Sequence, residues 1–177
     1  MSNNSKIRLP LSFKKLYELA YAALGDATPI QADCGLLCDR ACCRVEEEIT
    51  GMYLFPEENV MLRDMPDYMH LYDTDFEYDY GRYADLLSCD GHCERERRPL
   101  ACRIFPLLPY LHEDGRCEII VDPRGKGICP MAKTMNIEDF EPEFVDGVRR
   151  SMNILLKNNQ IRQFIHALSR QLDELRL

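Results

Sequence analysis

Nine cysteines occur in this chain of 177 residues, and four of them lie within a single short segment: Cys34, Cys38, Cys42 and Cys43. Thiols at this density form either a set of disulfide bonds or the ligands of a metal, and the redox state of the compartment decides between the two. An odd number of cysteines also leaves one thiol over in any complete disulfide pairing. The pattern therefore favours metal binding over disulfide bonds.

The N-terminal segment indicates where the protein resides. Three charged side chains interrupt its apolar runs: Lys14, Lys15 and Glu18. The segment has neither the apolar stretch nor the cleavage site of a secretory signal. No stretch of the chain is long and apolar enough to cross a bilayer. We therefore expect a cytoplasmic protein with reduced thiols and no membrane association. The net charge of −8 argues against nucleic acid as a partner.

A second group of cysteines follows later in the chain: Cys89, Cys93, Cys102 and Cys129. Pro99 suits the first turn of a helix, which would turn Cys102 inward one turn later. Cys129 is followed by proline, as one cluster ligand of bacterial ferredoxins is. Together with the first group, these residues make eight candidate metal ligands. Sites made only of thiolates hold zinc or an iron–sulfur cluster.

The spacing of the first group bears on the choice of metal. If the segment is one helix, Cys34, Cys38 and Cys42 share a face at steps of about 6 Å. Thiolates on one zinc ion lie about 3.8 Å apart, a distance that zinc sites usually obtain from two cysteines separated by two residues. This chain has no such pair. A helix therefore favours a [4Fe–4S] cluster, whose thiolates bind different irons. A loop beginning at Gly35 would fit Zn²⁺ as well.

Other residues near the cysteines have competing interpretations. Four arginines flank Cys93 and Cys102, where they would offset thiolate charge or form a solvated surface: Arg95, Arg97, Arg98 and Arg103. Cys117 lies in an alternating strand pattern, which predicts a packed core thiol. His92 could substitute as a ligand beside Cys93, but a neighbouring loop histidine is more often incidental.

The hydrophobic pattern predicts an α+β fold with short antiparallel strands and two C-terminal packing helices. Ser12 predicts a helix cap before Phe13, and Gly25 predicts its end. The predicted strands are 49–55, a hairpin of 68–72 with 76–80, and a second hairpin of 107–112 with 117–121. Two apolar helical stripes follow residue 137, with a break at Asn158-Asn159. We expect a cysteine-cluster domain at 1–136 and a helical segment at 137–177, which packs on that domain or docks a protein partner.

Several of these stretches together resemble the YkgJ-type cysteine-cluster family, also known as the CxxCxxCC zinc- or iron-chelating domain, which includes the flagellin lysine methylase branch. The resemblance covers about Cys34 to Pro130 and rests on these motifs: Cys34…Cys38…Cys42-Cys43-Arg44, Phe55-Pro-Glu-Glu58, Gly91-His-Cys93 and Arg98-Pro-Leu-Ala-Cys-Arg-Ile-Phe-Pro106. The resemblance implies six metal ligands: Cys34, Cys38, Cys42, Cys43, Cys93 and Cys102. Cys89 and Cys129 are additional candidates. The family name has two residues between cysteines where this chain has three. Which of Cys42 and Cys43 faces the metal, and whether there is one site or two, stay open.

Three functions follow from these observations. The first is a metal-binding protein that holds a [4Fe–4S] cluster or zinc. The second, implied by the methylase branch, is an S-adenosylmethionine-dependent protein-lysine methylase, in which the acidic stretch 68–85 would attract the substrate. The chain lacks both the glycine-rich turn and the cysteine spacing expected for that cofactor. The third is a thiol redox sensor or metal-handling protein, which the adjacent Cys42 and Cys43 allow.

Overall fold

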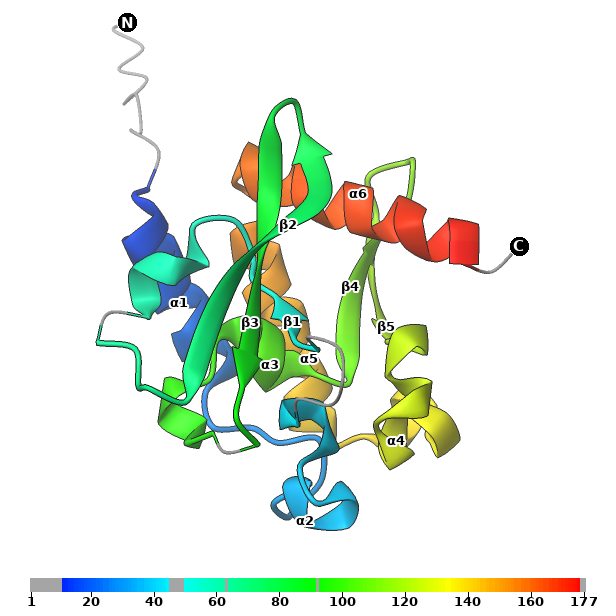
Figure 1. The fold of residues 1–177 in the computed structure, drawn as a ribbon. Coiled ribbons are helices and arrows are strands. Elements are labelled where there is room, and N and C mark those ends of the chain that lie inside the picture. Colours follow the sequence, from blue (N-terminus) through cyan, green and yellow to red (C-terminus); the bar gives the residue numbers. More distant parts are fainter. Residues whose placement is uncertain (1–10, 45–49, 63, 92, 176–177) are drawn as a thin grey trace, which may run out of the picture.

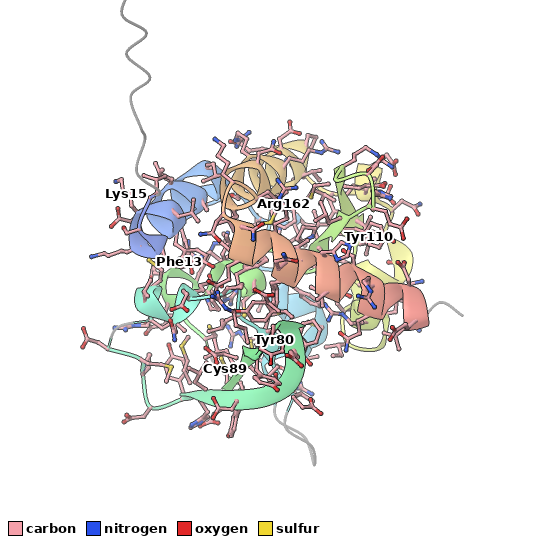
Figure 2. All side chains as sticks on the ribbon, turned by 90° about the horizontal axis from the view of Figure 1, so that it is seen from above. Phe13, Lys15, Tyr80, Cys89, Tyr110 and Arg162 are labelled. Carbon is pink, nitrogen blue, oxygen red and sulfur yellow. The ribbon has the colours of Figure 1, made fainter. Side chains whose placement is uncertain are left out.

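The computed structural model describes residues 11–44, 50–62, 64–91 and 93–175, and it has an α+β fold (Figure 1). Helix α1 (Phe13–Leu24) begins as predicted, because the Ser12 hydroxyl accepts a hydrogen bond from the Lys15 amide at 3.3 Å. Gly25 ends the helix with a positive φ of 63°. The apolar side of α1 is buried, whereas Lys15 points away from the protein (Figure 2).

Two antiparallel sheets form the β part of the fold. The larger sheet has the order β1-β3-β2, with these strands: β1 (Met52–Tyr53), β2 (Met69–Asp79) and β3 (Arg82–Cys89). The smaller is the hairpin of β4 (Leu107–Leu111) and β5 (Cys117–Val121), which confirms the second predicted hairpin. The predicted strand at 49–55 shortens to β1, and its first residue lies outside the described part of the chain.

The predicted hairpin of 68–72 with 76–80 is wrong. Residues 69–79 form one strand, β2, which pairs with β3 through a turn at Tyr80-Gly81. Gly81 has a positive φ of 67°, so the glycine and not the Asp73-Thr74-Asp75 stretch supplies the turn. That stretch instead forms an irregularity within β2, where the Thr74 hydroxyl donates a 2.7 Å hydrogen bond to the Ala84 carbonyl oxygen.

Short helical segments connect the strands, and six of the nine cysteines lie within them or immediately before them. Their bounds are α2 (Gly35–Cys38), η1 (Ala41–Cys43), η2 (Glu58–Met61), η3 (Arg95–Arg97), α3 (Leu100–Ile104), η4 (Pro123–Gly127), α4 (Pro130–Thr134) and η5 (Ile137–Asp139), where η is a 3₁₀ helix. The stretch after β5 is the 3₁₀ helix η4, in which the Asp122 side chain accepts a hydrogen bond from the Arg124 amide. These segments are short because glycine, proline and left-handed residues interrupt them.

The two C-terminal helices are α5 (Pro142–Leu155) and α6 (Asn159–Leu175), and they separate at the predicted Asn158-Asn159 break. Their apolar stripes are buried in the main core. Helix α5 lies against α1, where the Ser151 hydroxyl donates a 2.7 Å hydrogen bond to the Ala20 carbonyl oxygen. The packing role predicted for these helices is therefore confirmed.

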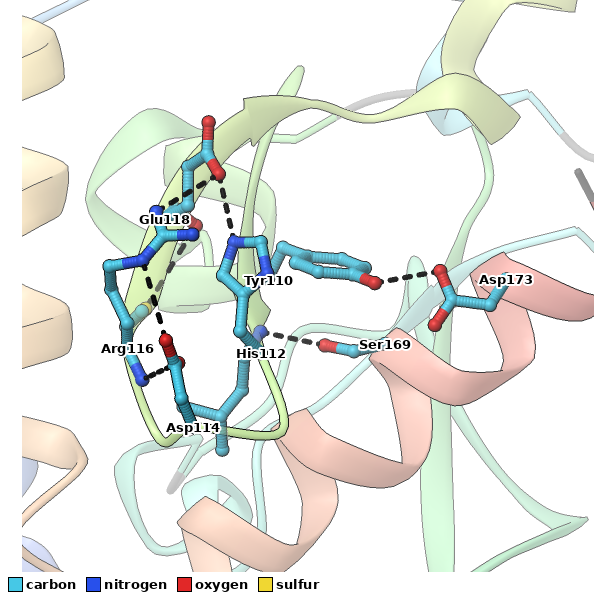
Figure 3. A network of polar contacts seen from close by, with 9 residues as sticks. Tyr110, His112, Asp114, Arg116, Glu118, Ser169 and Asp173 are labelled. Atoms are coloured by element: carbon cyan, nitrogen blue, oxygen red, sulfur yellow. Dashed lines mark hydrogen bonds and ion pairs between the residues drawn. The ribbon is translucent and has the colours of Figure 1, made fainter.

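Helix α6 crosses the strands on the side of the molecule away from α2 (Figure 1). Two of its side chains form hydrogen bonds with β4 (Figure 3). The Tyr110 hydroxyl donates to the Asp173 carboxylate at 2.7 Å, and the Leu111 amide donates to the Ser169 hydroxyl at 2.9 Å. Phe164 packs edge-on against Phe55, Phe76 and Tyr78. The helix therefore closes the core over both sheets.

Within the described residues, no helix has the length and apolar character that crossing a membrane requires. The proposed division into 1–136 and 137–177 stays a prediction.

The packing of α6 predicts that leucine-to-alanine substitutions at two of its positions change the free energy of unfolding by different amounts. Leu168 is 3% exposed and Leu175 is 67% exposed on the same helix. Leu168→Ala should lower the free energy of unfolding by roughly 2–5 kcal/mol, because it removes buried methyl groups and leaves a cavity. Leu175→Ala should change it by less than about 0.5 kcal/mol. Urea unfolding checks both variants, and equal losses would contradict the burial of this helix.

Candidate metal centre

Eight of the nine cysteines come from segments that meet at the end of the molecule where α2 and α4 lie, opposite α6 (Figure 1). None of the nine is in a disulfide bond. The first cysteine segment carries four of them, the end of β3 and the loop after it carry two, and α3 and the start of α4 carry one each. The structure thus brings together the eight candidate ligands that the sequence singled out.

The first cysteine segment is not one continuous helix. A single turn, α2, lies between Cys34 and Cys38, and the 3₁₀ helix η1 then holds Cys42 and Cys43. Between them Asp39 and Arg40 both adopt left-handed backbone angles, with φ of 48° and 54°. The straight row of Cys34, Cys38 and Cys42 that a helix would make is therefore absent. The loop from Gly35 that would also suit zinc is absent as well, because Gly35–Cys38 is helical and the backbone reverses only at Asp39 and Arg40.

A backbone hydrogen bond joins the two cysteine regions. The Gly91 amide donates to the Cys43 carbonyl oxygen at 2.8 Å. Gly91 has a positive φ of 73°, a conformation that side chains disfavour. The turn that Gly91 makes also separates Cys89, the last residue of β3, from Cys93. Figure 2 labels Tyr80 in the hairpin turn and Cys89 at the opposite end of β3.

Helices α3 and α4 bring in the last two cysteines. Pro99 immediately precedes α3, in which Cys102 is partly buried. Burial raises the pKa of the Cys102 thiol, and Cys93 and Cys43 raise it further. The Cys129 amide donates a 2.7 Å hydrogen bond to the Gly125 carbonyl oxygen, and Pro130 then starts α4. Cys129 itself is buried.

Two pairs of thiols interact directly. The sulfurs of Cys42 and Cys43 lie 3.9 Å apart. A hydrogen bond within this pair raises the pKa of Cys42 and lowers that of Cys43. The same interaction between Cys89 and Cys93 raises the pKa of Cys89 and lowers that of Cys93 to about 7. Each pair therefore has one thiol that holds its proton and one that ionises readily.

Arg98 faces several of these thiols, and Arg40 also lines the space among them and lowers the pKa of Cys43. Burial alone would lower the pKa of Arg98, but the Cys93, Cys43 and Cys34 thiols raise it. Its Nη2 donates to the Cys93 carbonyl oxygen at 3.3 Å. Its Nε is buried and has no hydrogen-bond partner among the described residues. A buried N–H without an acceptor costs about 1–3 kcal/mol, and a thiolate or a metal-bound sulfur would satisfy it.

The neighbouring arginines behave differently. Arg97 is exposed and pairs with Glu94 at 3.2 Å. Arg95 donates to the backbone carbonyl oxygens of Asp26 and Ala27. The Arg103 guanidinium lies over the Tyr21 ring, 4.8 Å from its centroid. Of the two roles that we considered for this group, Arg98 therefore fits the first, and Arg97 fits the surface role.

A small cavity lies among the cysteines. Its open volume is about 30 Å³, enough for a water molecule or an ion. Pockets for organic cofactors usually measure about 300–1,000 Å³. Arg98 and Phe105 help to line it, and the thiols in its wall are Cys34, Cys38, Cys42, Cys43 and Cys129. A larger hollow of about 460 Å³ between β2 and α6 is lined by several acidic side chains and by no cysteine.

The thiols gather without converging on a single point. Among the described residues, no three Cys, His, Asp or Glu side chains form a group that could hold a metal ion as they stand. A shared metal would require cysteine side chains to turn toward one another by changes of rotamer. The chemistry of the donors fits a thiolate metal centre, since eight free thiols lie at one end of the molecule and at least three of them act on the half-buried Arg98.

The remaining candidates lie elsewhere or outside the described residues. Cys117 is in β5, where burial raises its pKa to about 11 and the next influences are Arg162 and Glu118. It packs against the main core, as predicted. His92 falls outside the described residues. His112 pairs with Glu118 at 2.9 Å in the β4–β5 hairpin (Figure 3).

Glu58, to which the sequence pattern gave no role, is fully buried. Its carboxylate accepts hydrogen bonds from the Tyr21 hydroxyl at 2.8 Å and from the Phe55 and Leu100 amides. Burial raises its pKa from 4.5 to about 7, although these hydrogen bonds act in the other direction. Glu58 also raises the pKa of Cys102. A glutamate within the apolar Phe-Pro context of residues 55–58 was the signal that could have revealed it.

The comparisons identify no relative. No family model, no curated protein and no solved structure matches the chain. The resemblance to the cysteine-cluster family stays a prediction that rests on the quoted motifs.

The raised pKa of Glu58 predicts a pH-dependent stability. The folded protein binds a proton here up to about pH 7, whereas an unfolded glutamate releases it near pH 4.5. Stability from this group is therefore complete below pH 4.5 and is lost as the pH rises through 7, by no more than about 3 kcal/mol. Glu58→Gln removes this loss. Urea unfolding at pH 5 and pH 8 should show a larger fall for the wild type than for the variant, and equal falls would contradict the raised pKa.

Proposed function

We propose that this protein binds metal through cysteine thiolates, as a [4Fe–4S] cluster or as zinc. The observation that carries the proposal is the gathering of eight free thiols from four separate parts of the chain at one end of the molecule, where Arg98 acts on at least three of them. Thiols collected for core packing alone would not need a half-buried guanidinium among them. Cys117 provides the contrast, because it packs against the core at a distance from this cation.

Three features favour the cluster. Several of the thiols come from different segments, as they do when they bind different irons. Arg98 offsets part of the negative charge that thiolates and sulfide would carry. Cys129 is followed by Pro130, as one ligand of bacterial ferredoxins is.

Zinc is the second candidate, and three other observations favour it. The 3.9 Å separation of the Cys42 and Cys43 sulfurs matches the edge of a zinc–thiolate tetrahedron, about 3.8 Å. The open volume of about 30 Å³ admits a single ion without further opening. The curled backbone at Asp39 and Arg40 also removes the continuous helix that would have kept the thiols too far apart.

The first test measures metal and acid-labile sulfide in protein purified without oxygen. A cluster should give about four irons and four sulfides for each cluster held, with a brown colour. Zinc without sulfide in a colourless sample would identify the second candidate. Cys43→Ala and Cys102→Ala should each lower the metal content, and Cys117→Ala should keep it. Equal content in all three variants would contradict the ligand assignment.

The position of Arg98 predicts a change in metal retention. Arg98→Gln removes the cation that faces three of the thiols, so the thiolates repel one another more strongly. We expect metal to leave for an external chelator roughly tenfold faster, which corresponds to about 1.4 kcal/mol. Arg97→Gln is the matched control, because Arg97 is an exposed neighbour paired with Glu94. If both variants release metal at the same rate, Arg98 does not stabilise the centre.

A further inference from the structure

We propose that the outer edge of β2 binds an extended basic peptide, which adds a strand to the larger sheet and places a cationic side chain in the hollow between β2 and α6. This peptide site lies beside α6, away from the cysteine-rich end, so it does not depend on metal binding (Figure 1). Three features of the described residues support it: an open strand edge, a hollow beside that edge, and acidic side chains that exceed the cations around them.

One edge of β2 has no strand beside it. The larger sheet has the order β1-β3-β2, so β2 pairs only with β3 among the described residues. Every second backbone N–H and C=O group of such a strand points to the open side, where another strand can pair with it. The Phe76 amide donates to the Thr74 hydroxyl at 3.2 Å, but no backbone group from a further described segment pairs with residues 70–79. With eleven residues, β2 therefore offers a long open edge.

The edge is accessible from outside. Asp73, Asp75 and Glu77 are exposed along β2. The hairpin of β2 and β3 projects past α6, and Tyr80 at its tip is 99% exposed (Figures 1 and 2). A partner strand can therefore approach β2 without displacing another part of the described chain.

A hollow lies between β2 and α6. Its open volume of about 460 Å³ is within the usual range of ligand pockets, about 300–1,000 Å³. The rings of Tyr53 and Phe76 lie in its wall with their centroids 5.1 Å apart. Aromatic faces beside carboxylates suit an ammonium or guanidinium group, which both attract. The other residues of the wall come from β2 and α6: Asp75, Glu77, Ala167, Arg170, Gln171 and Glu174.

The wall carries more negative than positive charge. Three carboxylates face one guanidinium, that of Arg170. Asp75 and Glu174 form no ion pair within the part of the chain that the structure describes, and Glu77 accepts a 2.7 Å hydrogen bond from the Gly81 amide. No three acidic side chains of the described residues form a group that could hold a metal ion. An organic cation, whose charge is spread over several atoms, therefore fits the hollow better than a metal ion.

The charge on β2 favours a basic partner over a second copy of this chain. The strand contains Asp73, Asp75, Glu77 and Asp79 but no lysine or arginine. Two copies joined edge to edge would bring carboxylates together, which destabilises a strand pair. Asp73 already lies directly opposite Asp85 on β3, where burial and then Asp73 raise the pKa of Asp85. A strand with basic side chains would reduce this repulsion.

The first test measures binding of a peptide of about seven residues in which arginine alternates with valine and both ends are blocked. Fluorescence anisotropy of the labelled peptide should show binding to the full-length protein that weakens as salt is added. Asp75→Asn combined with Glu174→Gln should weaken it about fivefold or more, because two carboxylates of the hollow are lost. Glu138→Gln combined with Glu143→Gln is the matched control, since it removes the same charge from exposed residues elsewhere and should bind as the wild type does.

The second test examines strand addition on the wild-type protein, so it does not depend on how the variants fold. A peptide with the same side chains but methyl groups on alternate backbone nitrogens cannot donate the hydrogen bonds of a strand pair. It should bind roughly tenfold more weakly. The unmethylated peptide should also slow hydrogen exchange of amides within residues 70–79, whereas the methylated one should not.

The outcomes have distinct meanings. Equal binding of the two peptides shows attraction between charges alone and overturns strand addition. Equal binding by the two double variants overturns the hollow as the site of the cation. A dimer in sedimentation whose β2 amides are already protected shows that a second copy occupies the edge, which also overturns the proposal. Both double variants should keep the metal content of the wild type, so a failure here is distinguishable from a failure of the proposed metal binding.

Discussion

The buried carboxylate of Glu58 connects the parts of the chain that hold the cysteine-rich end in place. It accepts hydrogen bonds from Tyr21 on α1 and from the Leu100 amide at the start of α3. A buried carboxylate is costly unless hydrogen bonds satisfy it, so these contacts fix the relative positions of η2, α1 and α3. Cys102 is two residues beyond Leu100, and its position therefore depends on this buried group. The main core supports the same arrangement from behind, because α5 packs on α1.

The gathering of the thiols carries an electrostatic cost that Arg98 alone does not offset. Most of the thiols whose pKa changes hold their protons more strongly than usual, because neighbouring thiols and burial both disfavour the charged form. Cys43 and Cys93 are the exceptions, and each accepts a hydrogen bond from its partner thiol. The proposed metal would supply the positive charge that Arg98 and Arg40 do not. Protons and that metal would compete for the same sulfurs, so its binding would release protons.

Local patterns in the sequence predicted hairpins whose two strands are neighbours in the chain, and helices long enough to repeat their apolar pattern over several turns. Ser12 marked α1, the apolar stripes marked α5 and α6, and the strand patterns at 107–112 and 117–121 marked the β4–β5 hairpin. The pattern failed at β2, where alternation continues through Asp73 to Asp75 and only the Tyr80-Gly81 turn reverses the chain. The cysteines that gather at one end of the molecule were singled out from the sequence, because their spacing is visible there, and their role as ligands stays a prediction. The inward turn of Arg98 and the burial of Glu58 depend on contacts with distant segments, which no local pattern contains.

The backbone between Cys38 and Cys42 accounts for the arrangement that spacing alone left open. Two successive residues other than glycine, Asp39 and Arg40, adopt left-handed angles, at a cost of roughly 1–2 kcal/mol each. A continuous helix would avoid this cost but would place the thiols in a row along one face. Instead the reversal starts η1, in which the Cys43 amide bonds to the Arg40 carbonyl oxygen at 2.8 Å and the Cys43 carbonyl accepts from Gly91. Ion pairs of Arg40 with Asp33 and of Arg44 with Asp39 support the reversal. The strained backbone therefore directs Cys43 toward the second cysteine region. Because the chain reverses there, cysteines separated by three residues need not form a row along one helix face.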